Sequence, residues 1–242
     1  ADKLGKKILI SGGGRCNFTN LGVTPDKFIS ENKHFCKSAL SQFNQYDFIE
    51  MVKKHNIDYH EKTLGQLFCD KSAQQIINML LDEARSANVQ FSLKTTVEEV
   101  KKEDQYILET SKGRIITDSL VIATGGLSIP KIGATNFGYK LAHQFNLKMV
   151  ETSPALVPVT FTEKDKELFD KLSGIAFEAK VTCNKTSFTE NVLFTHRGLS
   201  GPAILQISSY WNQNDEIKIQ ILPKHNWQKF FEEKRQENPK QE

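Results

Sequence analysis

Three consecutive glycines, Gly12 to Gly14, follow the apolar run Ile8 to Ile10 near the start of the chain, with only Ser11 between them. Glycine runs cost backbone entropy and add no side chain to a core, so they occur where backbone must approach another group closely. Backbone N–H groups without neighbouring Cβ atoms can also face an anionic ligand. A strand that leads into such a turn is a common way to hold a nucleotide or a flavin. A solvent-exposed turn is the alternative.

The residues after the glycines favour a ligand site, because Arg15, Cys16 and Asn17 place polar groups directly beside the turn. The segment matches neither familiar nucleotide signature. Gly12 and Gly14 supply the first two glycines of a dinucleotide fingerprint, but Asn17 occupies the place of the third, and no Gly-Lys-Ser/Thr follows. The motif therefore indicates backbone close to a ligand without identifying that ligand.

Taken as a longer string, Lys7–Asn17 resembles a signature of a bacterial FAD-dependent oxidoreductase family. That family includes aminoacetone oxidases and a reductase of bile-acid dehydroxylation, and most of its members are known only as predicted flavoproteins. Two later stretches resemble the same family, namely Ile122–Gly126 with Gly133–Tyr139, and Phe194–Pro202. The resemblance implies an oxidoreductase that carries electrons through FAD between a small organic substrate and either oxygen or NAD(P)H.

The resemblance also implies which residues hold FAD. These are Lys7, Ser11, Gly12, Gly13, Gly14, Arg15, Cys16, Asn17, Val97, Ala123, Thr124, Gly125 and Gly126. Backbone N–H groups and the Arg15 cation would stabilise the negative charge of a reduced flavin. Four of these residues have a structural alternative: Arg15 as a surface arginine, Cys16 as a small buried side chain, Thr124 as part of a tight turn and Val97 as a plain strand valine.

His196 and Arg197 are the candidate catalytic pair. Histidine exchanges protons near neutral pH, and arginine can clamp a carboxylate or another anion. A helix predicted to begin with Ser200 as its N-cap would add N–H donors to the same anion site. The alternative is that the pair only caps this helix.

The family opens with a strand, a glycine-rich turn and a helix that grip the FAD pyrophosphate, and these are not found before Gly12. We therefore expect the chain to be an internal piece of a longer flavoprotein, and we expect this piece to bind FAD weakly or not at all by itself. The alternative function is a non-catalytic scaffold or interaction fragment that keeps the fold without the cofactor.

The predicted fold class is α/β (α+β), in three parts. Residues 1–152 are expected to form a partial FAD-binding Rossmann-like domain with a β-meander, and residues 153–223 an inserted β-rich domain. Residues 224–242 are expected to begin a truncated helical segment. The continuous apolar run Leu120–Ala123 predicts a strand buried on both faces of a parallel sheet.

Apolar periodicity predicts the remaining elements. Helices are predicted from Asp47 to His55, from Ser72 to Asn88 and over residues 137–146, and Val89 to Leu93 alternate as in a strand. Further strands are predicted over residues 97–101, 105–110, 113–117, 157–161, 176–183, 187–194 and 216–222.

Composition limits the partners. The net charge of +3 over 242 residues predicts no nucleic-acid surface, and the family resemblance implies a small molecule as the substrate. No apolar run is long enough to cross a membrane. The four cysteines show no C-x-x-C spacing, which indicates free thiols in a cytoplasmic protein and no metal site. The oligomeric state is left open.

Overall fold

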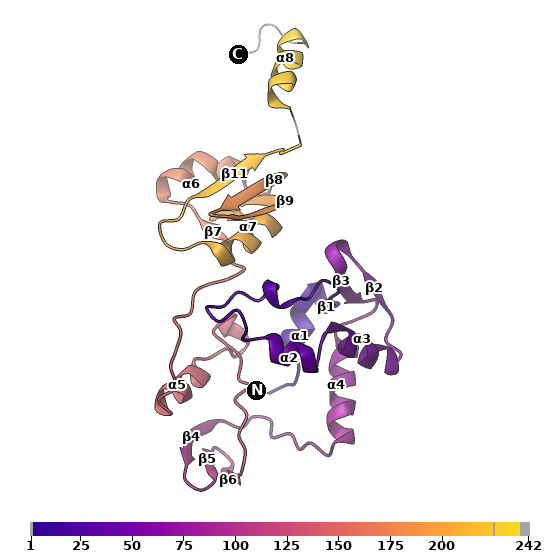
Figure 1. The fold of residues 1–242 in the computed structure, drawn as a ribbon, viewed down its shortest axis with the longest axis vertical. Helices are drawn as coiled ribbons and strands as arrows, with labels where there is room; N and C mark the ends of the chain where they lie inside the picture. Colours follow the sequence, from indigo (N-terminus) through magenta and orange to yellow (C-terminus); the bar gives the residue numbers. More distant parts are fainter. Residues whose placement is uncertain (1, 225, 238–242) are drawn as a thin grey trace. The chain divides into compact units, whose positions relative to one another are not determined.

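The computed structural model describes residues 2–224 and 226–237, which form two compact units divided at Val150 and Glu151 (Figure 1). Each unit has its own core, and each is described by itself. The helix α8 (Trp227–Glu237) lies in the predicted C-terminal helical segment, of which residues 225 and 238–242 lie outside the described part of the chain. None of the described helices is long and apolar enough to cross a membrane.

The first unit begins with a short helix, α1 (Lys6–Ile10), in place of the strand that commonly leads into a ligand-binding glycine turn. Gly5 starts this helix at a φ of 71°, and its carbonyl accepts a hydrogen bond from the Leu9 N–H at 2.9 Å. A strand at this place would need a neighbouring strand to pair its backbone groups, and none pairs with it among the described residues. The helical turn satisfies these groups locally instead.

A small antiparallel sheet and three helices follow the glycine turn in the chain. The strands β1 (Asn17–Asn20), β3 (Gln66–Cys69) and β2 (Tyr59–Glu61) pair in the order β1-β3-β2. The helices are α2 (Lys37–Gln42), α3 (Gln45–Lys54) and α4 (Gln74–Ser86). The core contains the buried side chains of Cys16, Val52, Ile57, Cys69, Ala73, Ile76 and Met79, and α2 contributes none of them.

Capping fixes where α3 begins, and the cap differs from the prediction. Asn44, not Asp47, is the N-cap, because its side chain accepts hydrogen bonds from the N–H groups of Tyr46 and Asp47. The Asp47 carboxylate accepts from the Asn44 N–H at 2.7 Å and completes a capping box. Asp47, the predicted first residue of the helix, is therefore the N3 residue whose side chain bonds back to the N-cap backbone.

The predicted β-meander is present as β4 (Val97–Lys102), β5 (Tyr106–Thr110) and β6 (Gly113–Thr117), paired in that order. Helix α5 (Phe137–Gln144) follows it in the chain. Leu141 of this helix shares a buried cluster with Val100 and Leu108 of the meander.

The predicted buried strand at Leu120–Ala123 is wrong, and the alternating stretch Val89–Leu93 is not a strand either. The Val121 side chain is 84% exposed, which is opposite to the expected burial. A continuous apolar run becomes a central strand only when strands pair with it on both sides. The described residues supply no such neighbour.

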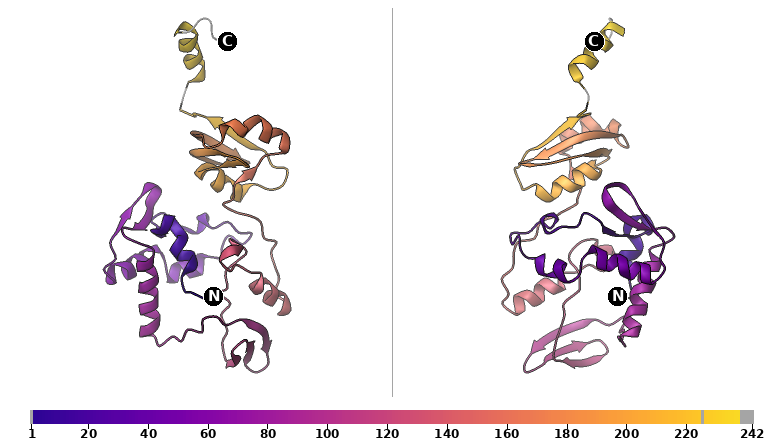
Figure 2. Two further views of the ribbon diagram at one scale, coloured as in Figure 1. Left: turned by 180° about the vertical axis from the view of Figure 1, so that it is seen from behind. Right: turned by 45° about the vertical axis from the view of Figure 1, so that its right-hand side comes forward.

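The second unit is an antiparallel sheet with helices packed against it, in keeping with the predicted β-rich composition. Its strands are β7 (Val159–Thr160), β8 (Ala176–Cys183), β9 (Thr186–Thr195), β10 (Gly198–Ser200) and β11 (Ile217–Ile221), in the order β11-β8-β9-β10-β7. Figure 2 shows α7 (Pro202–Ile207) against the sheet, where Ala203, Ile204 and Ile207 pack onto β8 and β9. A further helix that the sequence analysis missed, α6 (Glu163–Phe169), brings Phe169 to 5.2 Å from Phe161 between ring centroids.

We expect Ile204→Ala to destabilise the second unit by about 2–5 kcal/mol, because it leaves a cavity in a core where Ile204 is 0% exposed. The matched control is Ile221→Ala, which removes the same atoms from a side chain that is 50% exposed and should cost less than about 0.5 kcal/mol. Urea unfolding followed by tryptophan fluorescence measures both, since Trp211 and Trp227 both belong to this unit. Equal midpoints for the two variants would contradict the described core.

Candidate functional site

All three glycines of the first motif adopt left-handed backbone. Their φ angles are 55° at Gly12, 66° at Gly13 and 85° at Gly14, a region that residues with a Cβ rarely enter. A Cβ at Gly12 would lie 2.5 Å from the backbone nitrogen of Asn17, so the fold itself needs this glycine. A Cβ at Gly13 or Gly14 would meet no atom within 4 Å. The turn is therefore tight on its inner side and open on its outer side.

Backbone hydrogen bonds hold this turn against the core of the unit. The carbonyl of Gly14 accepts from the Ala73 N–H at 2.8 Å, at the entrance to α4. The carbonyl of Arg15 accepts from the Cys69 N–H at 3.0 Å, at the end of β3. Two elements distant in sequence thus fix the turn, so its open backbone is presented in a defined geometry.

The side chains that follow the turn alternate between solvent and core. Arg15 and Asn17 are exposed, whereas Cys16 is only 5% exposed and packs beside Val52 and Cys69. Burial raises the pKa of the Cys69 thiol to about 11, so this thiol stays protonated near neutral pH. The Cys16 side chain is buried, as in the structural alternative for this residue. A contact between flavin and the Cys16 backbone stays a prediction.

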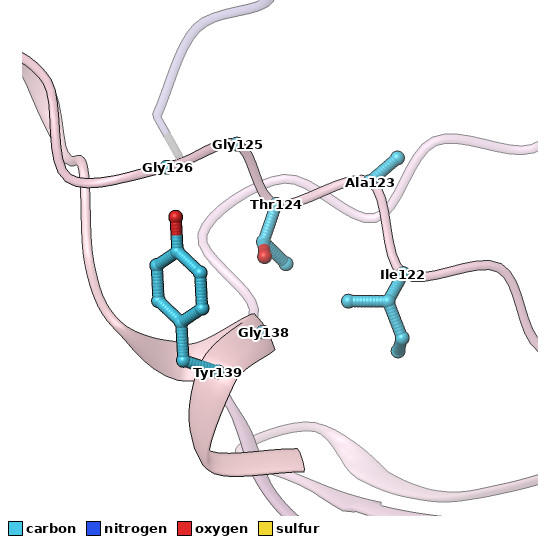
Figure 3. Close-up of a pocket in the computed structure, with 7 residues that line it drawn as sticks. All are labelled: Ile122, Ala123, Thr124, Gly125, Gly126, Gly138 and Tyr139. Atoms are coloured by element: carbon cyan, nitrogen blue, oxygen red, sulfur yellow. The ribbon is translucent and has the colours of Figure 1, made fainter. Parts of the chain in front are cut away.

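The second predicted turn lines an open pocket of about 590 Å³ (Figure 3). Its lining residues are Ile122, Ala123, Thr124, Gly125, Gly126, Gly138 and Tyr139. Gly125 has a φ of 74° and open space where a Cβ would stand. Close packing explains two further glycines, since a Cβ at Gly126 would lie 3.3 Å from the Tyr139 hydroxyl and one at Gly138 would lie 3.2 Å from the Thr124 hydroxyl.

Gly138 and Tyr139 are site residues that the sequence analysis did not select. They belong to the first turn of α5, and Figure 3 shows the Tyr139 ring rising from that helix toward Gly126. The available signal was the stretch Gly133–Tyr139, which was used for the family resemblance but was not assigned to the pocket.

One hydrogen bond connects the two glycine-rich segments. The Lys7 ammonium, on α1, donates to the Ser128 hydroxyl at 3.0 Å, two residues after Gly126. The glycines 12–14 do not line the pocket around Thr124. The structure thus brings Lys7, rather than the first turn itself, to the second segment.

Val97 lies at the start of β4, paired with Thr110, and its side chain packs against the buried cluster of the meander. This placement agrees with the structural alternative for Val97, an ordinary apolar residue of a strand. The predicted hydrogen bond from its backbone to adenine remains a prediction.

His196 and Arg197 form the turn between β9 and β10, and both side chains are exposed. The turn is held by its backbone, because the Thr195 hydroxyl accepts from the N–H groups of Arg197 and Gly198 at 3.3 and 3.2 Å. Within the described residues, neither side chain takes part in a hydrogen bond or ion pair.

The predicted helix start at Ser200 is wrong. Ser200 ends β10, Gly201 is the N-cap, and α7 begins at Pro202. The three residues of β10 span about 10 Å between the turn and the helix. A Cβ at Gly201 would lie 2.6 Å from the carbonyl oxygen of Asn191, so the helix start is packed against β9. A shared anion site of His196, Arg197 and the start of α7 stays a prediction.

Among residues 2–224 and 226–237, no cluster of histidine, cysteine and carboxylate side chains could hold a metal ion.

The fold and these turns define a mixed α/β protein with two glycine-rich segments open to a ligand. The chain belongs to the family described as the HI0933-like protein Rossmann domain, whose model matches residues 1–200. This is a flavoprotein family, and FAD is the cofactor that membership implies.

Three curated relatives are similar over most of the chain. The chain is 52% identical over 241 residues to the ribosomal RNA dihydrouridine synthase of Escherichia coli, covering 99% of the chain and 60% of that protein. The protein of the same name from Haemophilus influenzae is 45% identical over 246 residues, covering 99% of the chain and 61% of that protein. The 3-dehydro-bile acid delta(4,6)-reductase of Clostridium scindens is 26% identical over 236 residues, covering 92% of the chain and 56% of that protein. The chain thus spans about 60% of the length of the first two.

The prediction of a small-molecule substrate and no nucleic-acid partner is contradicted by two of these relatives, whose names specify ribosomal RNA. The physical reason lies in the argument from charge. A net charge of +3 is a sum over all faces of the molecule, and it does not describe the charge of any one surface segment.

We expect Gly13→Val, made in the longer protein, to lower the amount of bound flavin much more than it lowers stability. The substitution fills open space, so it adds about 1–3 kcal/mol of left-handed backbone strain without a collision, but it blocks the backbone from a ligand. The ratio of flavin to protein absorbance and the melting temperature measure the two effects.

Gly12→Val is the matched comparison. Its Cβ collides with the Asn17 backbone, so both flavin content and melting temperature should fall together. A Gly13→Val protein with normal flavin content would reduce the first motif to an ordinary turn.

Proposed function

We propose that the longer protein to which this chain corresponds is an FAD-dependent reductase that converts uridine in ribosomal RNA to dihydrouridine. The identity of 52% and 45% to two proteins named for that activity, each over 99% of the chain, carries the proposal. The bile-acid reductase, at 26%, supports a reductase in general but a steroid substrate only weakly. An RNA substrate of this kind is also in keeping with the predicted cytoplasmic location.

The described residues fit a flavin on two observations. A Cβ at Gly13 or Gly14 would meet no atom within 4 Å, so the outer side of the first turn is open. The pocket around Thr124 is lined by three glycines, Gly125, Gly126 and Gly138, together with Ile122, Ala123, Thr124 and Tyr139. When bound, FAD supplies hydride transfer, and NAD(P)H is the donor class that a reduction needs. In this proposal the N–H groups of Gly13 and Gly14 and the exposed Arg15 cation stabilise negative charge on the reduced flavin.

Dihydrouridine carries two more hydrogens than uridine, across the C5–C6 bond of the base. One arrives as a hydride and the other as a proton, so the reaction needs a proton donor. We assign this role to His196, whose exposed imidazole takes part in no hydrogen bond among the described residues. Arg197, beside it in the same turn, is assigned to a phosphate of the RNA.

The longer protein should bind FAD non-covalently and form dihydrouridine when it is incubated with NAD(P)H and unmodified ribosomal RNA transcribed in vitro. Mass spectrometry of the digested RNA detects the gain of two hydrogens per modified uridine. A protein that holds FAD but leaves the RNA unchanged would contradict the substrate. A protein that neither contains nor takes up FAD would favour the scaffold alternative.

We expect His196→Gln to keep the flavin spectrum and to slow dihydrouridine formation roughly a hundredfold, the low end for a lost proton donor. Arg197→Lys should mainly raise the Michaelis constant for RNA, because a point charge replaces a two-pronged donor. Both variants change exposed side chains, so the melting temperature should stay constant. Unchanged kinetics in both would leave this turn with a structural role only.

A further inference from the structure

Residues 32–46, here named the aromatic–basic segment, expose large aromatic side chains beside unpaired cations. Phe35 is 78% exposed, Tyr46 58% and Phe43 49%. Lys33 and Lys37 lie in the same segment, which contains no aspartate or glutamate, although Glu31 and Asp47 directly flank its two ends. Among the described residues, no carboxylate lies within 4.0 Å of either ammonium group, although ion pairs bind many other lysines of the chain.

Hydrogen bonds fix the backbone of this segment and of the loop before it. The Phe35 N–H donates to the Asn32 carbonyl at 3.0 Å, and the Cys36 thiol donates to the Pro25 carbonyl at 3.7 Å. At the other end, the Gln45 amide donates to the carbonyls of Leu21 and Val23 at 3.2 and 3.3 Å. The exposed rings are therefore presented by anchored backbone, which lowers the entropy lost when a partner binds.

Ring contacts connect the segment with the strand that leaves the glycine turn. Phe43 packs edge-on against Phe48 of α3, with ring centroids 6.4 Å apart. Phe48 in turn packs against Phe18 of β1 at 5.9 Å. Since β1 begins at Asn17, the last residue of the first motif assigned to flavin, the segment and the glycine turn belong to one packed part of the first unit.

Exposed rings together with unpaired cations fit single-stranded nucleic acid. Each base offers a flat face that can stack on an aromatic ring, and each phosphate offers a negative charge for a lysine. Another part of the same polypeptide could cover the rings, but it would also have to desolvate Lys33 and Lys37 or supply carboxylates to them. The positive charges of Lys33 and Lys37 complement the negative charges of a polyanion.

We propose that the aromatic–basic segment binds a single-stranded stretch of the RNA substrate, with a base stacked on Phe35 and phosphates paired with Lys33 and Lys37. This inference rests on the proposed function and extends it to a binding surface. It also explains how a chain with a net charge of only +3 can hold RNA, because the cations act locally.

The test measures binding of a fluorescein-labelled oligouridylate to the FAD-loaded longer protein by fluorescence anisotropy. Phe35→Ala should weaken binding about tenfold, whereas Phe35→Tyr keeps a ring and should restore most of the affinity. Phe35→Leu keeps an apolar side chain without a flat face and should behave like the alanine variant. The control is Phe91→Ala, which removes an aromatic ring that is 45% exposed elsewhere in the same unit.

The double variant Lys33→Ala/Lys37→Ala should also weaken binding, and it should lower the slope of log Kd against log salt concentration by about 1.4, or about 0.7 per lost phosphate contact. The control is Lys94→Ala/Lys148→Ala, which removes the same charge from two other exposed lysines of this unit. Binding should then match the wild type.

Flavin content, melting temperature and dihydrouridine formation are measured on every protein. The proposal holds if the variants in the segment lose affinity at constant flavin content and melting temperature while the controls do not. Wild-type affinity in the Phe35→Ala and lysine variants, with dihydrouridine still formed, overturns this surface and leaves the proposed function intact. A lower melting temperature at unchanged affinity identifies the segment as an internal packing surface and also overturns it. A wild-type protein that forms no dihydrouridine overturns the proposed function, and the inference with it.

Discussion

The geometry of the first unit depends on one crowded contact beneath the glycine turn. The α-carbon of Gly12 approaches the Asn17 backbone so closely that no β-carbon fits between them, and this closeness lets the chain reverse before β1. Carbonyls of the same turn are tied to the end of β3 and to the entrance of α4. Because the inner side is filled by protein backbone, the outer side is left without side chains. A crowded inner contact and an open outer face thus arise from the same three residues.

Elements specified by local pattern could be predicted from the sequence. The alternation over residues 97–117 gives the meander β4 to β6, and the alternation over residues 176–194 gives the pair β8 and β9. In such hairpins each strand pairs with a strand that is only a few residues away in the sequence. The run Leu120–Ala123 failed for the opposite reason, since its environment depends on strands far away in the sequence, and a hydrophobic run does not reveal whether those strands are present.

The candidate site was predictable where backbone decides it, and less so where side chains do. The glycines of both turns were found because left-handed and crowded positions exclude other residues. Tyr139 was not predicted because the sequence of a helix does not show that one of its tyrosines lines a pocket formed with a distant turn. The burial of Cys16 follows from long-range packing against Val52 and Cys69, and sequence spacing cannot reveal such packing. The prediction of no nucleic-acid partner was wrong because the net charge of the whole chain does not report the charge of a local segment.

The turn at His196 and Arg197 has a consequence for how such a protein could change its substrate. Gly198 and Gly201 flank the stretch after the turn, and a β-carbon at Gly198 would lie 2.0 Å from the carbonyl oxygen of Val159. These two positions have no freedom to vary without displacing neighbouring strands. The two side chains at the tip are exposed, and they make no hydrogen bond or ion pair that the described part of the chain would lose. The two glycine positions are thus fixed by packing, whereas His196 and Arg197 can be replaced. Substitutions at these two residues would therefore change the chemistry of the turn with little change in the stability of the fold.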